Sequence, residues 1–431
     1  MTQRNSLQEP LTKGVLPVIV FRADDLDATF EKVRAWHPHD PAPYVIICSM
    51  RTTTGMLAAL VLVSMCALAA DTASDGGGGT AGHAVESSSR WTLRYTVHGY
   101  DRDVPLWLVP AAGGGASLFV RKRAALGWSM LRWDGTSWKR AGLPAQFGKT
   151  WGLEIGASPS GETIWAATSV PHGEYDDTTD HLWQLSDGRW THRSAENAIV
   201  NGVSDIAVDT RGDAWFMTGY DPEGGGSNVL RWSGNTLRVQ APPSGPILTG
   251  ITAAAPDDAW VLNQEERERT WHWNGASWTD VPYPCAMGSP RPPCRGRAYL
   301  QRLSLAARPD GHAWAVGPDW ADGGSPVVLH WDRTRWEQMS MDLVRTGLTT
   351  VRVDPVGGLW IAARPASGTP YVLNLRHGRW TRFTLREGDP AEYITDIAPV
   401  PGTTRLWVQT KRQDPTGPPG GPVTARVYEL H

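Results

Sequence analysis

The sequence predicts an all-β fold, a seven-bladed β-propeller of four-stranded blades, and three observations lead to this prediction. A strand motif containing tryptophan recurs along the chain, a hairpin motif recurs between its copies, and one strand-like segment at each end of the repeats lacks a partner. A repeat of about 40–50 residues with four strand-like segments is typical of propeller blades. The 46 Gly and 33 Pro residues favour short strands joined by turns.

The first motif is a Gly or Asp followed by a small or apolar residue and then Trp, as in "GDAWFMTG" and "GHAWAVG". Successive copies lie 45 to 54 residues apart, which is the spacing of one blade. The apolar residues after each Trp predict a buried strand. The six tryptophans of this motif are Trp165, Trp215, Trp260, Trp314, Trp360 and Trp407.

The second motif is a hairpin whose two bracketing positions are five residues apart in all six copies. Asp-Gly, Asn-Gly and Ser-Gly-Asn between them supply the positive φ angles that tight hairpin turns need. We expect the tryptophans to fill the wedge between adjacent twisted blades, rather than to form a ligand platform. The pairs are Trp133/Trp138, Leu185/Trp190, Trp232/Leu237, Trp273/Trp278, Trp331/Trp336 and Leu375/Trp380.

The number of blades follows from the two segments without partners, "SSRWTLRYTV" at 88–97 and "TARVYELH" at 424–431. Pairing them completes a seventh blade from the two termini and removes the exposed edges of an open ring. A six-bladed ring is the alternative. The first blade is irregular, because "PLWLVPA", "ASLFVRK" and "WSMLRW" supply its inner strands and Trp107 is not equivalent to Trp165.

The N-terminal part predicts an exported protein. Residues 50–70 combine Arg51, an apolar run and a small-residue cleavage site, as in a signal peptide. Residues 71–87 form a Gly/Ser/Thr-rich linker, and the propeller covers 88–431. Residues 1–49 are either an upstream extension from a mis-assigned start or a short tail of a membrane-anchored protein. In this part, 15–21 is a predicted strand and 22–36 a predicted helix.

The expected location is therefore secreted or at the cell surface. Acylation of Cys66, which would make a lipoprotein, is a further option, although the bulky Met65 departs from that motif. Cys285 and Cys294 lie close together in a Pro-rich loop and suit a disulfide in an oxidising compartment; two unpaired thiols are the alternative. The 44 acidic and 41 basic residues nearly cancel, which argues against nucleic acid as a partner. We expect a monomer that uses no metal and no cofactor.

The candidate binding surface lies on one face of the ring. Two of the four turn classes of each blade are short and nearly constant, and the other two vary in length and emerge on the same face. Polar and aromatic side chains of these variable loops are either a ligand site or solvated loop charge. The candidate ligand-binding residues are Glu174, Tyr175, Asp176, Asp177, Asp221, Glu266, Asp319 and Trp320.

No catalytic residue is assigned. The chain contains no G-x-S-x-G, H-E-x-x-H or P-loop motif. His272, His330 and His312 are expected to occupy one repeat position in different blades, which suits a structural role better than catalysis.

The motifs "HAWAVG" and "WDGTSW" resemble those of the secreted tryptophan-rich propellers of actinobacteria, and "GGLWIAA" more loosely resembles the repeats of regulator-type sensor propellers. The resemblance implies the fold and export, and it covers about residues 88–431. It implies little about activity, because propellers host many functions. The favoured hypothesis is a non-enzymatic propeller that binds a protein or carbohydrate ligand. The alternatives are a glycan-active hydrolase or lyase with carboxylates in the funnel, and a sensory module of a signalling system.

Overall fold

The structure is a computed structural model of the 431-residue chain, which divides into two compact units, residues 1–78 and 79–431. The first unit is described over 18–22, 45–52 and 55–61. The second is described from residue 84 to 431 except for the following gaps: 88–89, 101–106, 122–126, 151, 172–177, 194–198, 200–201, 220–225, 241, 243–246, 264–268, 283–302, 320–324, 340, 342–345, 355–356, 366–367, 386–391 and 414–422.

The first unit contains a three-stranded sheet. Strand β1 (Val18–Arg22) pairs in parallel with β2 (Val45–Thr52), and β2 pairs antiparallel with β3 (Gly55–Val61). Strand β1 overlaps the strand predicted at 15–21, whereas the helix predicted at 22–36 lies outside the described residues. Strand β3 falls within the apolar run of the predicted signal peptide, whose cleavage stays a prediction. Across the described residues, no helix is long and apolar enough to cross a membrane.

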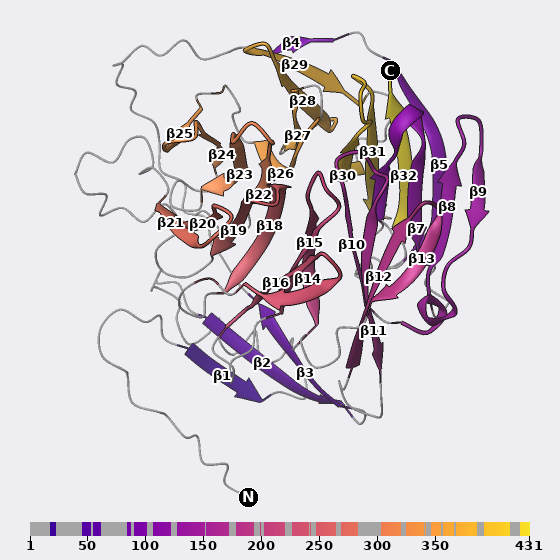
Figure 1. The fold of residues 1–431 in the computed structure, drawn as a ribbon, viewed down its shortest axis with the longest axis vertical. Coiled ribbons are helices and arrows are strands. Elements are labelled where there is room, and N and C mark those ends of the chain that lie inside the picture. Colours follow the sequence, from indigo (N-terminus) through magenta and orange to yellow (C-terminus); the bar gives the residue numbers. More distant parts are fainter. Residues whose placement is uncertain are drawn as a thin grey trace, which may run out of the picture. The chain divides into compact units, whose positions relative to one another are not determined.

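The second unit is a seven-bladed β-propeller whose blades are numbered here in chain order from β6 (Figure 1). In six blades the four strands pair antiparallel in sequence order. Blade 1 contains β6 (Trp107–Pro110), β7 (Ala116–Val120), β8 (Ser129–Trp133) and β9 (Trp138–Ala141); blade 2 contains β10 (Gly152–Ala157), β11 (Ile164–Pro171), β12 (Thr178–Ser186) and β13 (Arg189–Arg193); blade 3 contains β14 (Val203–Val208), β15 (Ala214–Thr218), β16 (Val229–Ser233) and β17 (Thr236–Val239).

Blade 4 contains β18 (Leu248–Ala255), β19 (Asp258–Asn263), β20 (Arg269–Trp273) and β21 (Trp278–Pro282); blade 5 contains β22 (Ser304–Ala307), β23 (Ala313–Asp319), β24 (Ser325–Trp331) and β25 (Trp336–Gln338); blade 6 contains β26 (Thr346–Val353), β27 (Leu359–Pro365), β28 (Tyr371–Arg376) and β29 (Arg379–Thr384). Blade 7 contains β30 (Glu392–Pro399), β31 (Leu406–Gln413), β32 (Val423–Leu430) and β5 (Trp91–Tyr100). Two short 3₁₀ turns, η1 (Ala112–Gly114) and η2 (Ala145–Lys149), lie before β7 and before β10.

The two termini close the ring as predicted. Strand β5, near the start of the propeller sequence, pairs antiparallel with the C-terminal strand β32 and becomes the outer strand of blade 7. Blade 7 packs on blade 1, because its buried Trp407 and Val427 share one hydrophobic cluster with Leu118 and Trp133. The seven-bladed prediction is therefore confirmed, and the six-bladed alternative is wrong. At the end of the predicted linker, β4 (Val85–Glu86) adds a short parallel strand to the outer edge of blade 6.

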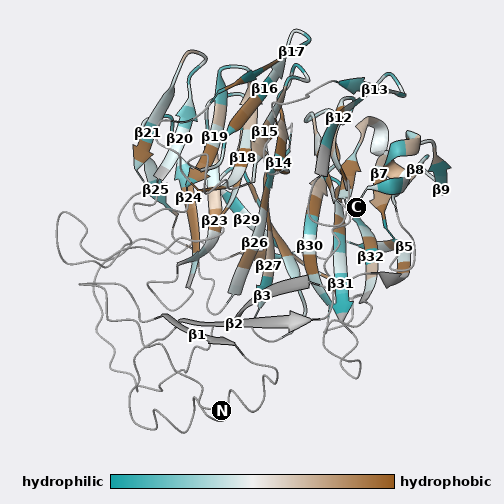
Figure 2. Cartoon of the chain, turned by 90° about the horizontal axis from the view of Figure 1, so that it is seen from below, coloured by the Kyte–Doolittle hydropathy of each residue, from teal (hydrophilic) through white to brown (hydrophobic). Residues whose placement is uncertain are grey.

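The hairpin motif has the predicted register, and its tryptophans are core residues. Trp133 pairs with Trp138 across its turn, and Trp273 pairs with Trp278 in the same way. The tryptophans of the first motif lie one strand further in, on the second strand of blades 2 to 7, and Trp260 is fully buried. Its ring contacts Trp331 of the next blade with the centroids 5.2 Å apart. Tryptophan packing between blades is thereby confirmed, and Figure 2 shows hydrophobic residues along the strands throughout the ring.

The first blade is irregular as expected. Trp107 lies on the inner strand β6, whereas Trp165 lies on the second strand of blade 2. The antiparallel order of the strands puts the turns between strands 1 and 2 and between strands 3 and 4 at one end of every blade. The other two classes of connection, which are the variable loops of the sequence, leave from the opposite end. The inner strands β10, β14, β18, β22, β26 and β30 therefore all begin at the variable-loop end and run toward the short turns.

Candidate functional site

The candidate residues chosen from the sequence fall almost entirely outside the described residues. Only Asp319 belongs to a described element: it is the last residue of β23, and its backbone pairs with that of Ser325. The others flank described strands, between β11 and β12, β15 and β16, β19 and β20, and β23 and β24. These predicted site residues lie outside the described part of the chain and stay predictions; they are Glu174, Tyr175, Asp176, Asp177, Asp221, Glu266, Trp320 and the cysteines Cys285 and Cys294.

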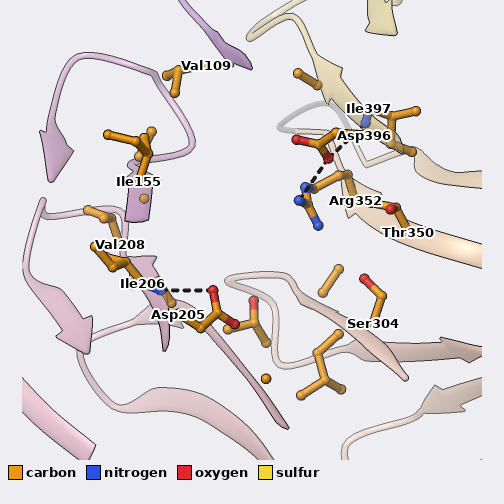
Figure 3. Close-up of a pocket in the computed structure, with 18 of the residues that line it drawn as sticks. Val109, Ile155, Asp205, Ile206, Val208, Ser304, Thr350, Arg352, Asp396 and Ile397 are labelled. Atoms are coloured by element: carbon orange, nitrogen blue, oxygen red, sulfur yellow. Dashed lines mark hydrogen bonds and ion pairs between the residues drawn. The ribbon is translucent and has the colours of Figure 1, made fainter. Parts of the chain in front are cut away.

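The described residues enclose a central channel, which no single repeat motif predicts. Its volume is about 610 Å³, and the inner strands of all seven blades contribute to its wall. The wall combines aliphatic and polar residues, with Val109, Ile155, Val208 and Ile397 among the aliphatic ones (Figure 3). A concave, largely apolar cavity with a few polar groups is the usual form of a binding site. The charged lining residues Asp205, Arg352, Asp396 and Lys411 are therefore the ones that could orient a ligand.

An ion pair crosses the boundary between blades 6 and 7 inside the channel. The Nη2 atom of Arg352 donates to Oδ1 of Asp396 over 3.0 Å, and its Nη1 donates to the carbonyl of Val351. The side chain of Arg352 is still 40% exposed, so part of its donor fork faces the cavity. In Figure 3, Arg352 and Asp396 lie on one side of the channel and Asp205 on the other. A guanidinium between two carboxylates offers donors and acceptors to the same ligand.

The carboxylate of Asp205 is held by the backbone. Its Oδ1 accepts the N–H of Ile206 over 2.9 Å, and its Oδ2 accepts the N–H of Ile251, on the inner strand of the next blade, over 3.0 Å. Ser304 occupies the same strand position in blade 5, and its hydroxyl accepts the N–H of Val351 in blade 6 over 3.1 Å. Both side chains therefore join neighbouring blades at the channel wall, which fixes the site on rigid strands.

Burial changes the protonation of the carboxylates around the channel. It raises the pKa of Asp205, which the backbone N–H donors and Arg352 oppose, and it raises the pKa of Asp396, which Arg352 opposes. Glu154 holds the position equivalent to Asp205 in blade 2. Burial raises its pKa well above the usual range, and the negative charge of Asp205 adds to this rise. A perturbed carboxyl group beside a cavity is a feature of functional sites and also of structural clusters.

These residues could have been found from the sequence by aligning the inner strands as well as counting the blades. In "GLEIGA", "VSDIAV" and "ITDIAP", the residue before the shared isoleucine is Glu154, Asp205 or Asp396. The residue after the shared apolar position is small in most blades but is Arg352 in blade 6. The repeat therefore carried a signal, namely acids and one arginine at positions that face the axis. Their approach to one another depended on the curvature of the ring.

The charged side chains of the channel wall can donate and accept hydrogen bonds. Neither histidine nor cysteine lines the channel among the residues that the structure describes. A cluster of three or more His, Cys, Asp or Glu side chains able to hold a metal ion is likewise absent from the described part of the chain. The geometry therefore favours hydrogen bonding to a bound group.

The fold and its channel define this chain as a seven-bladed β-propeller. No family model and no curated protein matches the sequence. Solved structures of similar fold include YCF48 bound to a D1 peptide, at 12% identity over 81% of this chain and 98% of that one, with a TM-score of 0.48. Others are the GH74 xyloglucanase from Xanthomonas campestris (15% identity, 78% of this chain and 55% of that one, TM-score 0.48) and an Aleuria aurantia lectin in complex with Fucα1-6GlcNAc (12%, 68% and 99%, TM-score 0.40). At these identities and TM-scores they give no argument about function.

Proposed function

We propose that this protein is a non-enzymatic binding propeller, which takes a peptide or glycan group into the variable-loop end of its channel. One observation supports the proposal above others: Arg352 and Asp396 present a donor and an acceptor 3.0 Å apart in the wall of the channel. A sugar hydroxyl or a peptide group both donates and accepts, so either could engage the two side chains together. The variable loops around the entrance would then add the contacts that select one ligand.

The test is binding of the full-length protein to a glycan array and to an array of immobilised peptides, each repeated with Arg352→Met. Loss of the arginine hydrogen bonds should weaken any channel ligand by about tenfold or more, because a hydrogen bond to a charged group contributes about 1.5–3 kcal/mol. Arg238→Met, on the exposed outer strand β17, is the matched control and should bind normally. Equal binding by Arg352→Met and the wild type would place the ligand elsewhere.

A glycan-active hydrolase or lyase is the second candidate, and the pairing of Glu154 with Asp205 favours it. One carboxyl group with a raised pKa beside a second carboxylate is the arrangement that separates acid from base. Against this, both oxygens of Asp205 already accept backbone N–H groups. Turnover of a polysaccharide panel that Glu154→Gln abolishes, while Glu162→Gln does not, would establish the enzyme and overturn the binding proposal.

We also propose that the propeller works outside the cytoplasm. The apolar run and small-residue site of residues 50–70 support export, and so does the resemblance of "HAWAVG" and "WDGTSW" to secreted propellers. N-terminal sequencing of protein from the culture medium of the source organism should find a mature start near Ala70. An exported chain that still begins at Met1 would contradict the predicted cleavage of the signal peptide. A diacylglycerol on Cys66 would favour the lipoprotein alternative.

A further inference from the structure

At the short-turn end of several blades, two polar side chains pair with each other. One member lies two residues before the blade tryptophan, and the other lies opposite that tryptophan on the third strand. In blade 3 these are Asp213 and Arg231, joined over 3.0 Å, and in blade 4 they are Asp258 and His272, also joined over 3.0 Å. Blade 7 reverses the order with Arg405 and Glu429. Each of these three pairs joins a carboxylate to a basic side chain, either arginine or histidine.

Blade 5 places a histidine at both positions. His330 lies opposite Trp314 on the third strand, as His272 lies opposite Trp260 in blade 4. His312 is in the inner turn and faces His330, so the prediction that all three histidines share one position is wrong for His312. It failed because "HAW" and "LHW" belong to different strands of the same blade. The Nδ1 atom of His312 is 2.9 Å from Nε2 of His330.

The two imidazoles share a hydrogen bond edge to edge. Their planes differ by only 5°, and nitrogens 2.9 Å apart are closer than stacked rings allow. One nitrogen must donate and the other must accept, so only one proton fits between the rings. The ring of His330 also lies against Trp314, with the centroids 5.0 Å apart. The first proton that the pair takes up leaves this bond in place, because an imidazolium N–H still donates to a neutral imidazole nitrogen. Once both rings are protonated, two N–H groups face each other and the bond breaks.

The charged groups around the pair do not replace the lost bond. Arg308, in the same turn, lies over Trp314 at 5.7 Å, forms an ion pair with Asp310, and donates to the carbonyl of Gly357 in blade 6 over 3.4 Å. From the outer hairpin, Asp332 accepts two backbone N–H groups and the Thr334 hydroxyl, and Glu337 pairs with Arg335.

The balance of these charges opposes protonation. Burial is the largest cause that lowers the pKa of His330, and the positive charges of His312 and Arg308 lower it further. The negative charges of Asp332 and Glu337 act in the opposite direction and raise this pKa. The hydrogen bond between His312 and His330 is therefore intact at neutral pH.

We propose that His312 and His330 form an acid-sensitive clip, which opens when acid protonates both rings and loosens the inner turn of blade 5 from the third strand. Because Arg308 in that turn contacts blade 6, opening also weakens this blade boundary. The acid–base pairs of blades 3, 4 and 7 keep their attraction over the same range, so the response is confined to blade 5.

Amide hydrogen exchange of the full-length protein at pH 7.5 and pH 5.0, corrected for intrinsic rates, tests the proposal. Peptides covering 308–314 and 325–333 should lose protection by about tenfold, the effect of losing one hydrogen bond, whereas the peptide covering 258–273 should not. His312→Asp copies the Asp–His pair of blade 4 and should abolish the loss in blade 5. Asp258→His copies the blade 5 pair and should transfer the loss to blade 4.

If His312→Asp folds poorly, the double change His312→Asp with His330→Arg copies the Asp–Arg pair of blade 3 and should be insensitive to pH. Unchanged protection of blade 5 in the wild type at pH 5.0 would overturn the proposal. A loss of equal size in His312→Asp would overturn it as well, because the histidine pair would then not be the group that responds.

Discussion

Trp91 and Leu430 face each other across β5 and β32, in the position that Trp138 and Trp133 occupy in blade 1. The pair in blade 1 is joined by a turn, whereas Trp91 and Leu430 come from opposite ends of the propeller sequence. The indole N–H of Trp91 also donates to the carbonyl of Thr384 in blade 6 over 2.9 Å. One residue near the start of the propeller sequence therefore completes blade 7 and attaches it to its neighbour.

Deletion of residues 1–97 should destabilise the ring severely, because it removes most of β5 together with Trp91. The loss of a large buried aromatic side chain alone costs about 3–5 kcal/mol. Deletion of residues 1–80 should leave the melting temperature unchanged, since β4 and β5 both remain. Differential scanning calorimetry of the two truncated proteins makes the comparison. Equal melting temperatures would mean that the terminal strand does not hold the ring closed.

Thr270→Val should cost at least about 2 kcal/mol of unfolding free energy. The buried Thr270 hydroxyl donates to the carbonyl of Val281 and accepts the indole N–H of Trp336, which lies in the next blade, over 3.0 Å. Valine keeps the shape but leaves a buried donor and a buried acceptor unsatisfied, which costs about 1–3 kcal/mol for each group. Thr279→Val, on the exposed side of β21, is the matched control. Urea unfolding should separate the two variants, and similar midpoints would argue against this contact between blades.

Gly161→Ala should destabilise far more than Gly188→Ala. Both glycines have nearly the same positive φ, 71° and 73°. A Cβ at Gly161 would collide with the carbonyl of Pro110 in blade 1, whereas a Cβ at Gly188 would meet open space. The control therefore carries only the cost of a positive φ, about 1 kcal/mol. Thermal melts of both variants measure the difference, and similar melts would mean that blades 1 and 2 do not approach as closely as described.

Glu154→Gln should stabilise the protein at neutral pH. The carboxyl group ionises near pH 4.5 in the unfolded chain but at a much higher pH in the fold, because of burial and Asp205. Between these two values the folded state keeps a proton that the unfolded state releases, so the free energy of unfolding falls as the pH rises. The cost is about 1.4 kcal/mol for each pH unit of the shift. The amide never ionises, so it removes this cost.

The measurement is urea unfolding of the wild type and Glu154→Gln from pH 4 to pH 8. The two stability curves should run together near pH 4 and separate as the pH rises, with the variant above. Glu162→Gln, on the exposed inner turn of blade 2, should follow the wild type throughout. Parallel curves for Glu154→Gln and the wild type would show that Glu154 ionises normally in the fold.

The amino-acid sequence by itself determined the architecture of the propeller. The spacing of Trp165, Trp215 and Trp260 defines the blade period, and the five-residue hairpin positions define the register of the outer strands. Both are local patterns, since a strand alternates with period two and a tight turn needs particular residues. The partnership of 88–97 with 424–431 also followed, because two strands without partners leave a single way to close the ring.

Only the tertiary structure decided which polar groups meet. Arg352 and Asp396 are 44 residues apart, and Asp205 approaches Arg352 only because the ring brings blades 3 and 6 to one axis. His312 and His330 likewise stand 18 residues apart, on a turn and a strand that meet at the blade end. The variable loops drew the sequence-based prediction because they are polar. The described polar cluster lies on the inner strands. One side chain per repeat gives almost no local signal there, and the closure of the ring brings these side chains together in one site.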